Sequence, residues 1–170
     1  MGLFDWLGGR KSPAKGMQRH PVVMLRQALL AINRDTAPFI IRDGSPEGVD
    51  LVGEWKIVDA RWYEIFAEAG IEKAFKVLMK FDDANGEVRA LDQEWSVEWR
   101  AGVPRLSLNA EVFRGRKWEV SFESVTAFRE DLSFGKVYEY YFKSSEIKKP
   151  LQAAVLNAGW AWKSVALGKL

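Results

Sequence analysis

The sequence predicts an α+β domain built on a curved antiparallel sheet of about seven to nine strands. Apolar residues repeat at helical spacing near both ends of the chain, whereas through most of the middle they alternate with a period of two. Gly, Pro, Asn and Ser separate the alternating segments, as is typical of turns between antiparallel strands. Helices are expected to cover one face of this sheet. The alternative architecture is a closed β-barrel around the C-terminal helix.

The first helix is expected over residues 21–33. Pro21 suits the first helical turn, where its missing N–H would have had no partner. An apolar stripe follows it, made of Val22, Leu25, Leu29 and Ile32.

The chain before this helix predicts an arm rather than part of the core. Residues 8–19 are rich in Gly, Lys and Pro, as in flexible linkers. The chain is therefore divided into an arm, 1–19, and a single α+β domain, 20–170. A candidate interaction site begins the arm, and it is a short apolar patch made of Leu3, Phe4, Trp6 and Leu7. With the basic residues after it, this patch is suited to dock on a membrane surface or a partner.

Strands are expected where the period changes to two. Residues 38–57 predict a strand, a Gly/Ser/Pro turn and a second strand. Residues 71–82 and 87–99 predict a hairpin closed by the three-residue loop Ala84-Asn85-Gly86. That loop pairs Met79 with Leu91, whereas a two-residue loop would pair Met79 with Asp92.

The preferred register has a consequence for the acidic residues of the second strand. It pairs Phe75 with Trp95 and turns Asp92, Glu94 and Glu98 away from the core. Further strands are expected over residues 104–113, 118–125 and 137–142.

A short middle helix is expected over residues 60–69, with the Asp59 carboxylate as its N-cap. A C-terminal helix is expected over 150–158, with Pro150 in its first turn and Gly159 in the left-handed conformation that ends it. A strand over 160–167 follows. The alternative for this region is one long helix.

The candidate ligand-binding residues are carboxylates and tyrosines, because these side chains bind small polar ligands and carry acid–base chemistry. They are Tyr63, Asp92, Tyr138 and Tyr140. A ligand site would need at least two residues from the set of these four and Asp59 to converge in one cavity. The chain has no cysteine, one histidine and no Gly-rich phosphate loop, so no catalytic residue, metal site or cofactor is predicted.

The formal net charge is only +2, and the basic excess lies at the two ends of the chain. Residues 1–20 hold four basic residues against Asp5, and residues 143–170 hold five lysines against Glu146. The acidic middle argues against nucleic acid as a partner, because phosphate binding needs a positive field. The absence of cysteine fits a cytoplasmic location, and no apolar run is long enough to span a membrane.

Two segments, WKIVDARWYEIF and YFKSSEIKKPLQAAVLNAGWAWKSVALGKL, resemble sequences of a bacterial protein family of unknown function. The resemblance runs from about Val49 to the C-terminus and implies no activity. The outline of strands followed by a terminal apolar helix is similar to tubby-like and pleckstrin-homology-like barrels, without a motif of either.

Three functions remain after these exclusions. The leading hypothesis is a non-catalytic binding or protein-interaction module, with a protein partner or a second copy of the chain as its ligand. The second is a small-ligand-binding protein or enzyme that uses the carboxylates and tyrosines. The third is peripheral membrane attachment through the N-terminal apolar patch.

Overall fold

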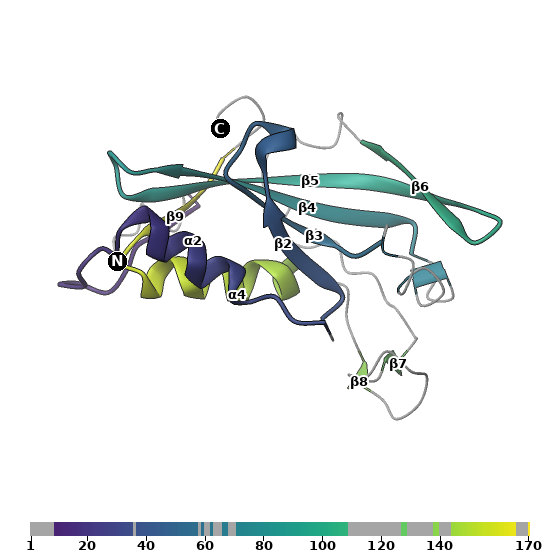
Figure 1. Cartoon of the computed structure of the whole chain (residues 1–170), viewed down its shortest axis with the longest axis horizontal. Helices are drawn as coiled ribbons and strands as arrows, with labels where there is room; N and C mark the ends of the chain where they lie inside the picture. Colours follow the sequence, from purple (N-terminus) through teal and green to yellow (C-terminus); the bar gives the residue numbers. More distant parts are fainter. Residues whose placement is uncertain are drawn as a thin grey trace.

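The structure is a computed structural model that describes residues 9–35, 37–57, 59, 62, 66–67, 71–108, 127–128, 138–139, 144–165 and 170. Its main feature is a mixed seven-stranded sheet with two helices on one face, α2 (Val22–Leu30) and α4 (Ser144–Asn157) (Figure 1). The predicted α+β class is confirmed. The sheet does not close on itself, so the barrel alternative is wrong.

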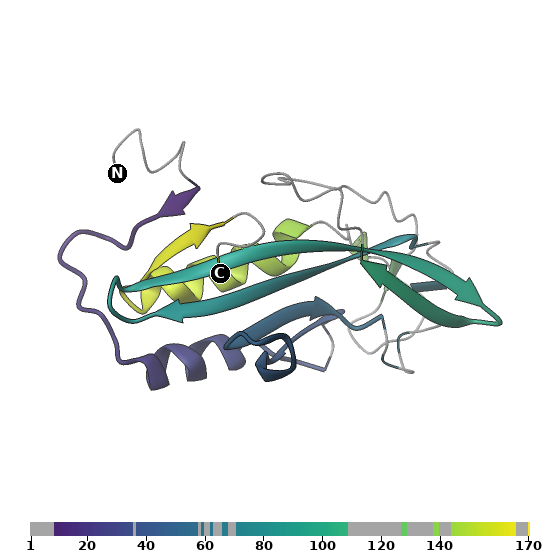
Figure 2. The same cartoon turned by 90° about the horizontal axis from the view of Figure 1, so that it is seen from above.

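The strand order starts at one sheet edge and ends at the other. It runs β1 (Arg10–Lys11), β9 (Ala161–Ser164), β5 (Glu87–Arg100), β4 (Lys73–Asp82), β3 (Leu51–Trp55) and β2 (Phe39–Asp43). Neighbours are antiparallel except β9, which lies parallel to β5. The sixth strand in sequence, β6 (Val103–Leu108), pairs with the far half of β5, which is long enough to serve both neighbours (Figure 2).

Two smaller elements complete the described chain. A short 3-10 helix, η1 (Ser45–Glu47), joins β2 to β3. The strands β7 (Ala127–Phe128) and β8 (Tyr138–Glu139) form a separate two-stranded sheet, which lies apart from the main sheet (Figure 1).

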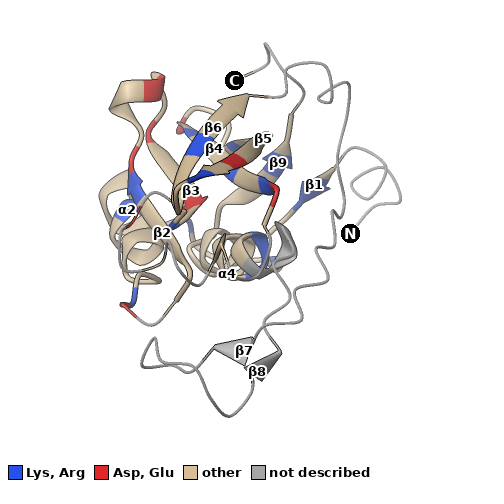
Figure 3. Cartoon of the chain, turned by 90° about the vertical axis from the view of Figure 1, so that its right-hand side faces the viewer, with Lys and Arg blue, Asp and Glu red and all other residues tan. Residues whose placement is uncertain are grey.

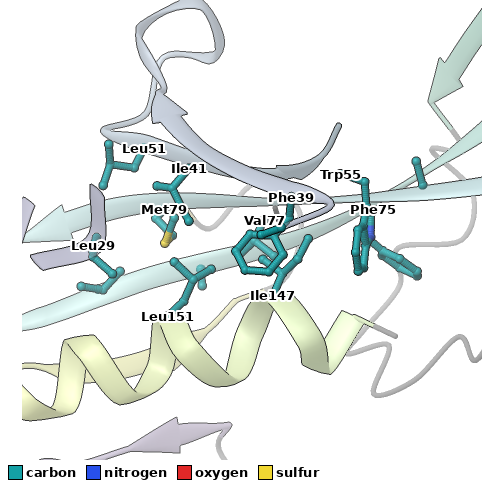
Figure 4. Close-up of a cluster of buried hydrophobic side chains, with 14 of the residues drawn as sticks. Leu29, Phe39, Ile41, Leu51, Trp55, Phe75, Val77, Met79, Ile147 and Leu151 are labelled. Atoms are coloured by element: carbon teal, nitrogen blue, oxygen red, sulfur yellow. The ribbon is translucent and has the colours of Figure 1, made fainter. Parts of the chain in front are cut away.

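The core lies between the sheet and the two helices. Ile147, Leu151 and Val155 form a fully buried stripe on α4, and Leu25 and Leu29 do the same on α2. They face the apolar side of the central strands (Figure 4). Gly53 of β3 permits the close approach of α4, because a Cβ there would lie 3.3 Å from both Ile147 Cγ2 and Leu151 Cδ1.

The β4–β5 hairpin differs from the prediction by one residue. Asp82 pairs with Glu87, so the loop has four residues, and Met79 faces Ala90 rather than Leu91. The turn starts one residue early because the Asp82 carboxylate accepts from the Asn85 N–H (3.1 Å) and from its side-chain amide (2.7 Å). Gly86 has the expected left-handed backbone, with φ +63°.

This shift reverses the two faces of β5 near the turn, since the side-chain period of a strand is two. Farther along the strand, Val97 still belongs to the core. Asp92 now faces the helices beside Val77, and Glu94 does so beside Phe75. Leu91 instead packs on the outer face with Val52 and Leu78. The predicted outward positions of Asp92 and Glu94 are therefore wrong.

The C-terminal region is a helix followed by a strand, so the single-helix alternative is wrong. Gly159 has φ +77°, and the Trp160 N–H donates to Val155 O at 3.1 Å, as in the predicted glycine-ended helix. The helix begins at Ser144 rather than at Pro150, which lies inside it. The burial of Ile147 in the added turn offsets the hydrogen bond that Pro150 cannot donate.

The segment around the predicted middle helix is described in part. Residues 66–67 are helical, and the Phe66 N–H donates to Trp62 O at 3.0 Å. The Ile71 N–H donates back to Phe66 O at 3.2 Å, the bond expected if residue 70 ends the helix. The capping role of the Asp59 side chain stays a prediction.

Residues 9–20 lie along the sheet edge and the end of α4. The first strand, β1, pairs with β9, and the Trp160 side chain donates to His20 O at 2.8 Å. Arg19 stacks over the Trp160 ring, 5.1 Å from its centroid. The division of the chain at residue 19 stays a prediction.

Candidate functional site

Asp92 lies between the sheet and α4, where it forms an ion pair with Lys148. The Lys148 Nζ is 2.6 Å from Asp92 Oδ2, and the two side chains are only 13% and 14% exposed. Burial raises the pKa of Asp92, and the adjacent Lys148 charge and hydrogen bond lower it by a smaller amount. The desolvation cost of this carboxylate therefore exceeds its attraction to the lysine.

Glu94 repeats this arrangement one step along the same face of β5. Its side chain is fully buried, and its Oε1 lies 3.0 Å from Lys73 Nζ. Each carboxylate thus has a lysine of its own, one from α4 and one from β4. Paired in this way, the two acidic residues tie neighbouring elements together, and a ligand-binding role for Asp92 stays a prediction.

For the other predicted ligand-binding residues, the structure shows only where Tyr138 lies relative to Asp92. Tyr138 belongs to β8, on the separate two-stranded sheet, whereas Asp92 is in the main sheet (Figure 1). Tyr63, Tyr140 and the apolar patch of Leu3, Phe4, Trp6 and Leu7 lie outside the described residues.

A row of four basic residues crosses the opposite face of the sheet. Arg10 of β1 lies opposite Lys163 of β9, Lys163 opposite Arg89 of β5, and Arg89 opposite Lys80 of β4. We call these four residues the basic row. Their neighbours in sequence point the other way: Trp162, Val88 and Met79 are buried in the core beneath the sheet.

The basic row is reached by solvent and is only partly neutralised. Glu87 contacts Arg10 and lies 3.6 Å from Lys163 Nζ. The Arg10 and Lys163 side chains are 35% and 40% exposed, and Lys80 is also exposed. Among the residues that the structure describes, neither Lys80 nor Arg89 has a partner in an ion pair.

Arg89 has a further unsatisfied group. Its Nε is buried and has no hydrogen-bond partner within the described part of the chain. A guanidinium donates through five N–H groups, and two of them can bind two oxygens of a carboxylate or phosphate at once. Like charges directly opposite each other also destabilise a sheet. An anion placed over the row would relieve this repulsion.

The positive charge of the basic row helps to lower the pKa of a nearby carboxyl group, that of Asp82. The pKa of Asp82 is lowered, first by its hydrogen bonds from Asn85 and then by the positive charges of Arg89 and Lys163. Figure 3 shows the basic segments of β1 and β9 side by side at this edge of the sheet.

The sequence does not predict this site, although one of its features, the basic residues at both ends of the chain, is visible there. No local pattern predicts that these two ends pair. In the structure β1 and β9 pair, so the two basic ends become one surface. Lys80 and Arg89 complete the row only in the observed register, because both lie on the outer face of their strands.

The described residues contain no group of three or more His, Cys, Asp or Glu side chains that could hold a metal ion. Among the same residues, no helix combines the length and apolar character needed to cross a membrane. Comparisons with protein-family models, with curated proteins and with solved structures found no match. The basic row is therefore interpreted from its own chemistry.

Proposed function

We propose that the protein is a non-catalytic binding module that recognises anionic groups, with phosphate as their shared chemistry, through the basic row. The observation that carries this proposal is the pairing of β1 with β9, which aligns Arg10 and Lys163 with Arg89 and Lys80. Among the described residues, two of these four cations, Arg10 and Lys163, contact a carboxylate, that of the buried Glu87. The reducing, cytoplasmic location expected from the cysteine-free sequence belongs to the same proposal.

The row suits binding better than catalysis. Arginine and lysine are strong hydrogen-bond donors to phosphate oxygens, and neither accepts a proton readily when exposed and charged. A site of this kind holds an anion in place without activating a nucleophile.

The test is a titration of the isotope-labelled full chain with inorganic pyrophosphate at low ionic strength, followed by NMR. We expect shifts concentrated at the amides of Arg10, Lys80, Arg89 and Lys163. Lys80→Gln should weaken binding about threefold, because an exposed charge contact contributes roughly 0.5–1 kcal/mol.

Lys149→Gln is the matched control, because Lys149 is exposed on α4, on the other side of the sheet. It should leave the affinity unchanged. Shifts scattered over the whole surface, or equal losses in the two variants, would show that the row is not a site.

A further inference from the structure

We infer that anion binding at the basic row is coupled to the docking of the N-terminal strap, which we define as residues 9–20. The strap contributes Arg10 to the row only while β1 is paired with β9. A bound anion therefore keeps the strap on the sheet, and the docked strap strengthens anion binding. This inference rests on the proposed function, since the row is the anion site, and it adds the regulation of that site.

The outer end of the strap is a short edge strand without a buried residue. The strand β1 has two residues, and both pair with β9. Next to this pairing, the Ser164 N–H donates to Gly9 O at 2.9 Å. None of residues 9–20 is buried. A segment that buries so little apolar surface opens locally at a small cost in free energy compared with global unfolding.

The inner end of the strap is anchored to the end of α4. The His20 N–H donates to Ala158 O at 2.9 Å, and Arg19 stacks over the Trp160 ring. The connection between the two ends runs around the end of the sheet, from β1 to α2 (Figure 2). It contains Gly16, which has φ +82° and open space around it. The strand β1 can therefore leave β9 by rotation near Gly16 while residues 18–20 stay in place.

The docked strap brings two cations together over one carboxylate. Arg10 lies directly opposite Lys163, and like charges in this position destabilise a pair of strands. Glu87 contacts Arg10 and lies 3.6 Å from Lys163 Nζ, so a single negative charge serves both. An anion bound over the pair supplies further negative charge and so favours the docked strap.

The docked and released states thus present different sites to an anion. With β1 released, the row keeps three of its four cations. Since an anion contacts Arg10 only in the docked state, it binds that state more tightly. One exposed charge contact changes an affinity about threefold. Because linkage is reciprocal, a saturating anion favours docking of the strap by the same factor.

The surface beside the row indicates which anions fit it. Leu170 packs on the outer-face cluster that contains Leu78 and Leu91, next to the β4 and β5 members of the row. This side chain occupies the face beyond the row. At the β1 end, the Arg10 and Lys163 side chains are 35% and 40% exposed. We therefore expect a compact anion at the β1 end of the row rather than an extended surface.

The test is hydrogen exchange of the isotope-labelled full chain, followed by NMR with and without saturating inorganic pyrophosphate at low ionic strength. The Ser164 N–H reports on docking, because its acceptor is Gly9 O of the strap. Pyrophosphate should slow the exchange of this amide about threefold. The Val165 N–H is the internal reference, since it donates to Ala90 O of β5 instead.

Two variants compare the opposite faces of β1. Arg10→Gln should abolish the slowing at Ser164 and lower the pyrophosphate affinity about threefold. Lys11→Gln is the matched control, because Lys11 points to the helix side, where its Nζ donates to Gln152 Oε1 of α4 at 2.7 Å. It should keep the threefold slowing at Ser164. The response of Val165 should be the same in both variants.

A third variant weakens docking without removing Arg10. Backbone groups of alternate residues point to the same side of a strand, so the Lys11 N–H points to β9 as the Gly9 carbonyl does. Lys11→Pro removes this donor and should lower the pyrophosphate affinity about threefold relative to Lys11→Gln. Thermal melts show whether each variant is folded. If Lys11→Pro does not fold, the comparison of Arg10→Gln with Lys11→Gln decides the question.

The failures of the two proposals are distinguishable. Pyrophosphate shifts at the row without a change in Ser164 exchange would overturn the coupling and leave the proposed function standing. Equal responses of Ser164 in Arg10→Gln and Lys11→Gln, or an unchanged affinity of folded Lys11→Pro, would also overturn the coupling. No binding of pyrophosphate to the wild-type chain would remove both proposals.

Discussion

Arg10 lies directly opposite Lys163 where β1 pairs with β9, and both side chains are directed to the Glu87 carboxylate. The shared carboxylate explains how the sheet tolerates two cations in one cross-strand position. Arg89 and Lys80, the next pair in the row, form no ion pair among the described residues, although Asp82 is close enough for Arg89 to lower its pKa. The row is thus neutralised by direct contact at the Arg10–Lys163 end and only from a distance at the Arg89–Lys80 end, where like charges face each other.

The first prediction concerns the stability of the Arg89–Lys80 end. Lys80→Gln should raise the free energy of unfolding by a few tenths of a kcal/mol, because it removes a like-charge cross-strand pair. Urea denaturation at low ionic strength measures this change, and added salt should diminish it. Lys149→Gln serves as the control. A loss of stability in Lys80→Gln would mean that Lys80 has a structural partner and that repulsion from Arg89 does not dominate.

The second prediction concerns the buried ion pair below the sheet. Lys148→Met should lower the free energy of unfolding by about 3–5 kcal/mol at neutral pH, because it leaves the Asp92 carboxylate buried without its cation. Replacing both residues, as Asp92→Leu with Lys148→Met, should recover most of this loss. A single variant as stable as the wild type would show that the carboxylate is solvated by other groups.

The same ion pair gives a pH dependence with a defined sign. The pKa of Asp92 is raised by burial in the folded chain, so between its unfolded and folded values the folded state binds the additional proton. This contribution to stability is complete below the unfolded pKa and is lost as the pH rises through the folded pKa. Asp92→Asn should remove this pH-dependent contribution, because an amide side chain does not titrate. Urea midpoints of the two proteins at a series of pH values measure the difference, and parallel curves would contradict the raised pKa.

The third prediction concerns the contact between the N-terminal segment and the end of α4. Gly159→Ala should cost about 3 kcal/mol, because its φ is +77° and a Cβ would lie 2.5 Å from Gln18 O. Gly48→Ala is the matched control, with φ +73° and open space around the added carbon. It should cost only about 1–2 kcal/mol. The difference in thermal stability between the two variants measures the cost of the contact between the added Cβ and the backbone of residues 18–19. Equal losses of stability would show that residues 18–19 move aside to make room.

The fourth prediction concerns the opposite edge of the sheet. The Asn33 side chain donates to Ile41 O and accepts from the Ile41 N–H, both at 2.7 Å, and so occupies the outer edge of β2. Asn33→Ala should cost about 1–3 kcal/mol and promote self-association, because exposed strand edges pair with one another. Gln27→Ala, at an exposed position of α2, is the control. Light scattering after size-exclusion chromatography measures association; a stable monomer would contradict the role of Asn33.

Local sequence patterns determined which segments are helices and which are strands, and where some of them end. The stripe of α2 and the alternation of Phe75, Val77 and Met79 follow from side-chain periodicity, and the structure has both. Gly159 and Gly86 have the left-handed backbones that were expected of them, because glycine alone adopts this conformation without steric cost. These features depend on residues close together in the sequence.

The register of the hairpin required more than the apolar pattern. The alternation of β4 and β5 favoured pairing Met79 with Leu91, yet the hydrogen bonds between Asp82 and Asn85 start the turn one residue earlier. That single step carries Asp92 to Lys148 and turns Arg89 outward.

The candidate site was decided by tertiary structure alone. Arg10 and Lys163 are separated by most of the chain, and their pairing depends on the free edge that β5 offers to β9 and that β9 then offers to β1. By itself the sequence determined that both ends of the chain are basic. Only the folded sheet placed them in one row, because cross-strand neighbours are set by backbone hydrogen bonds between distant segments and not by the sequence around each residue.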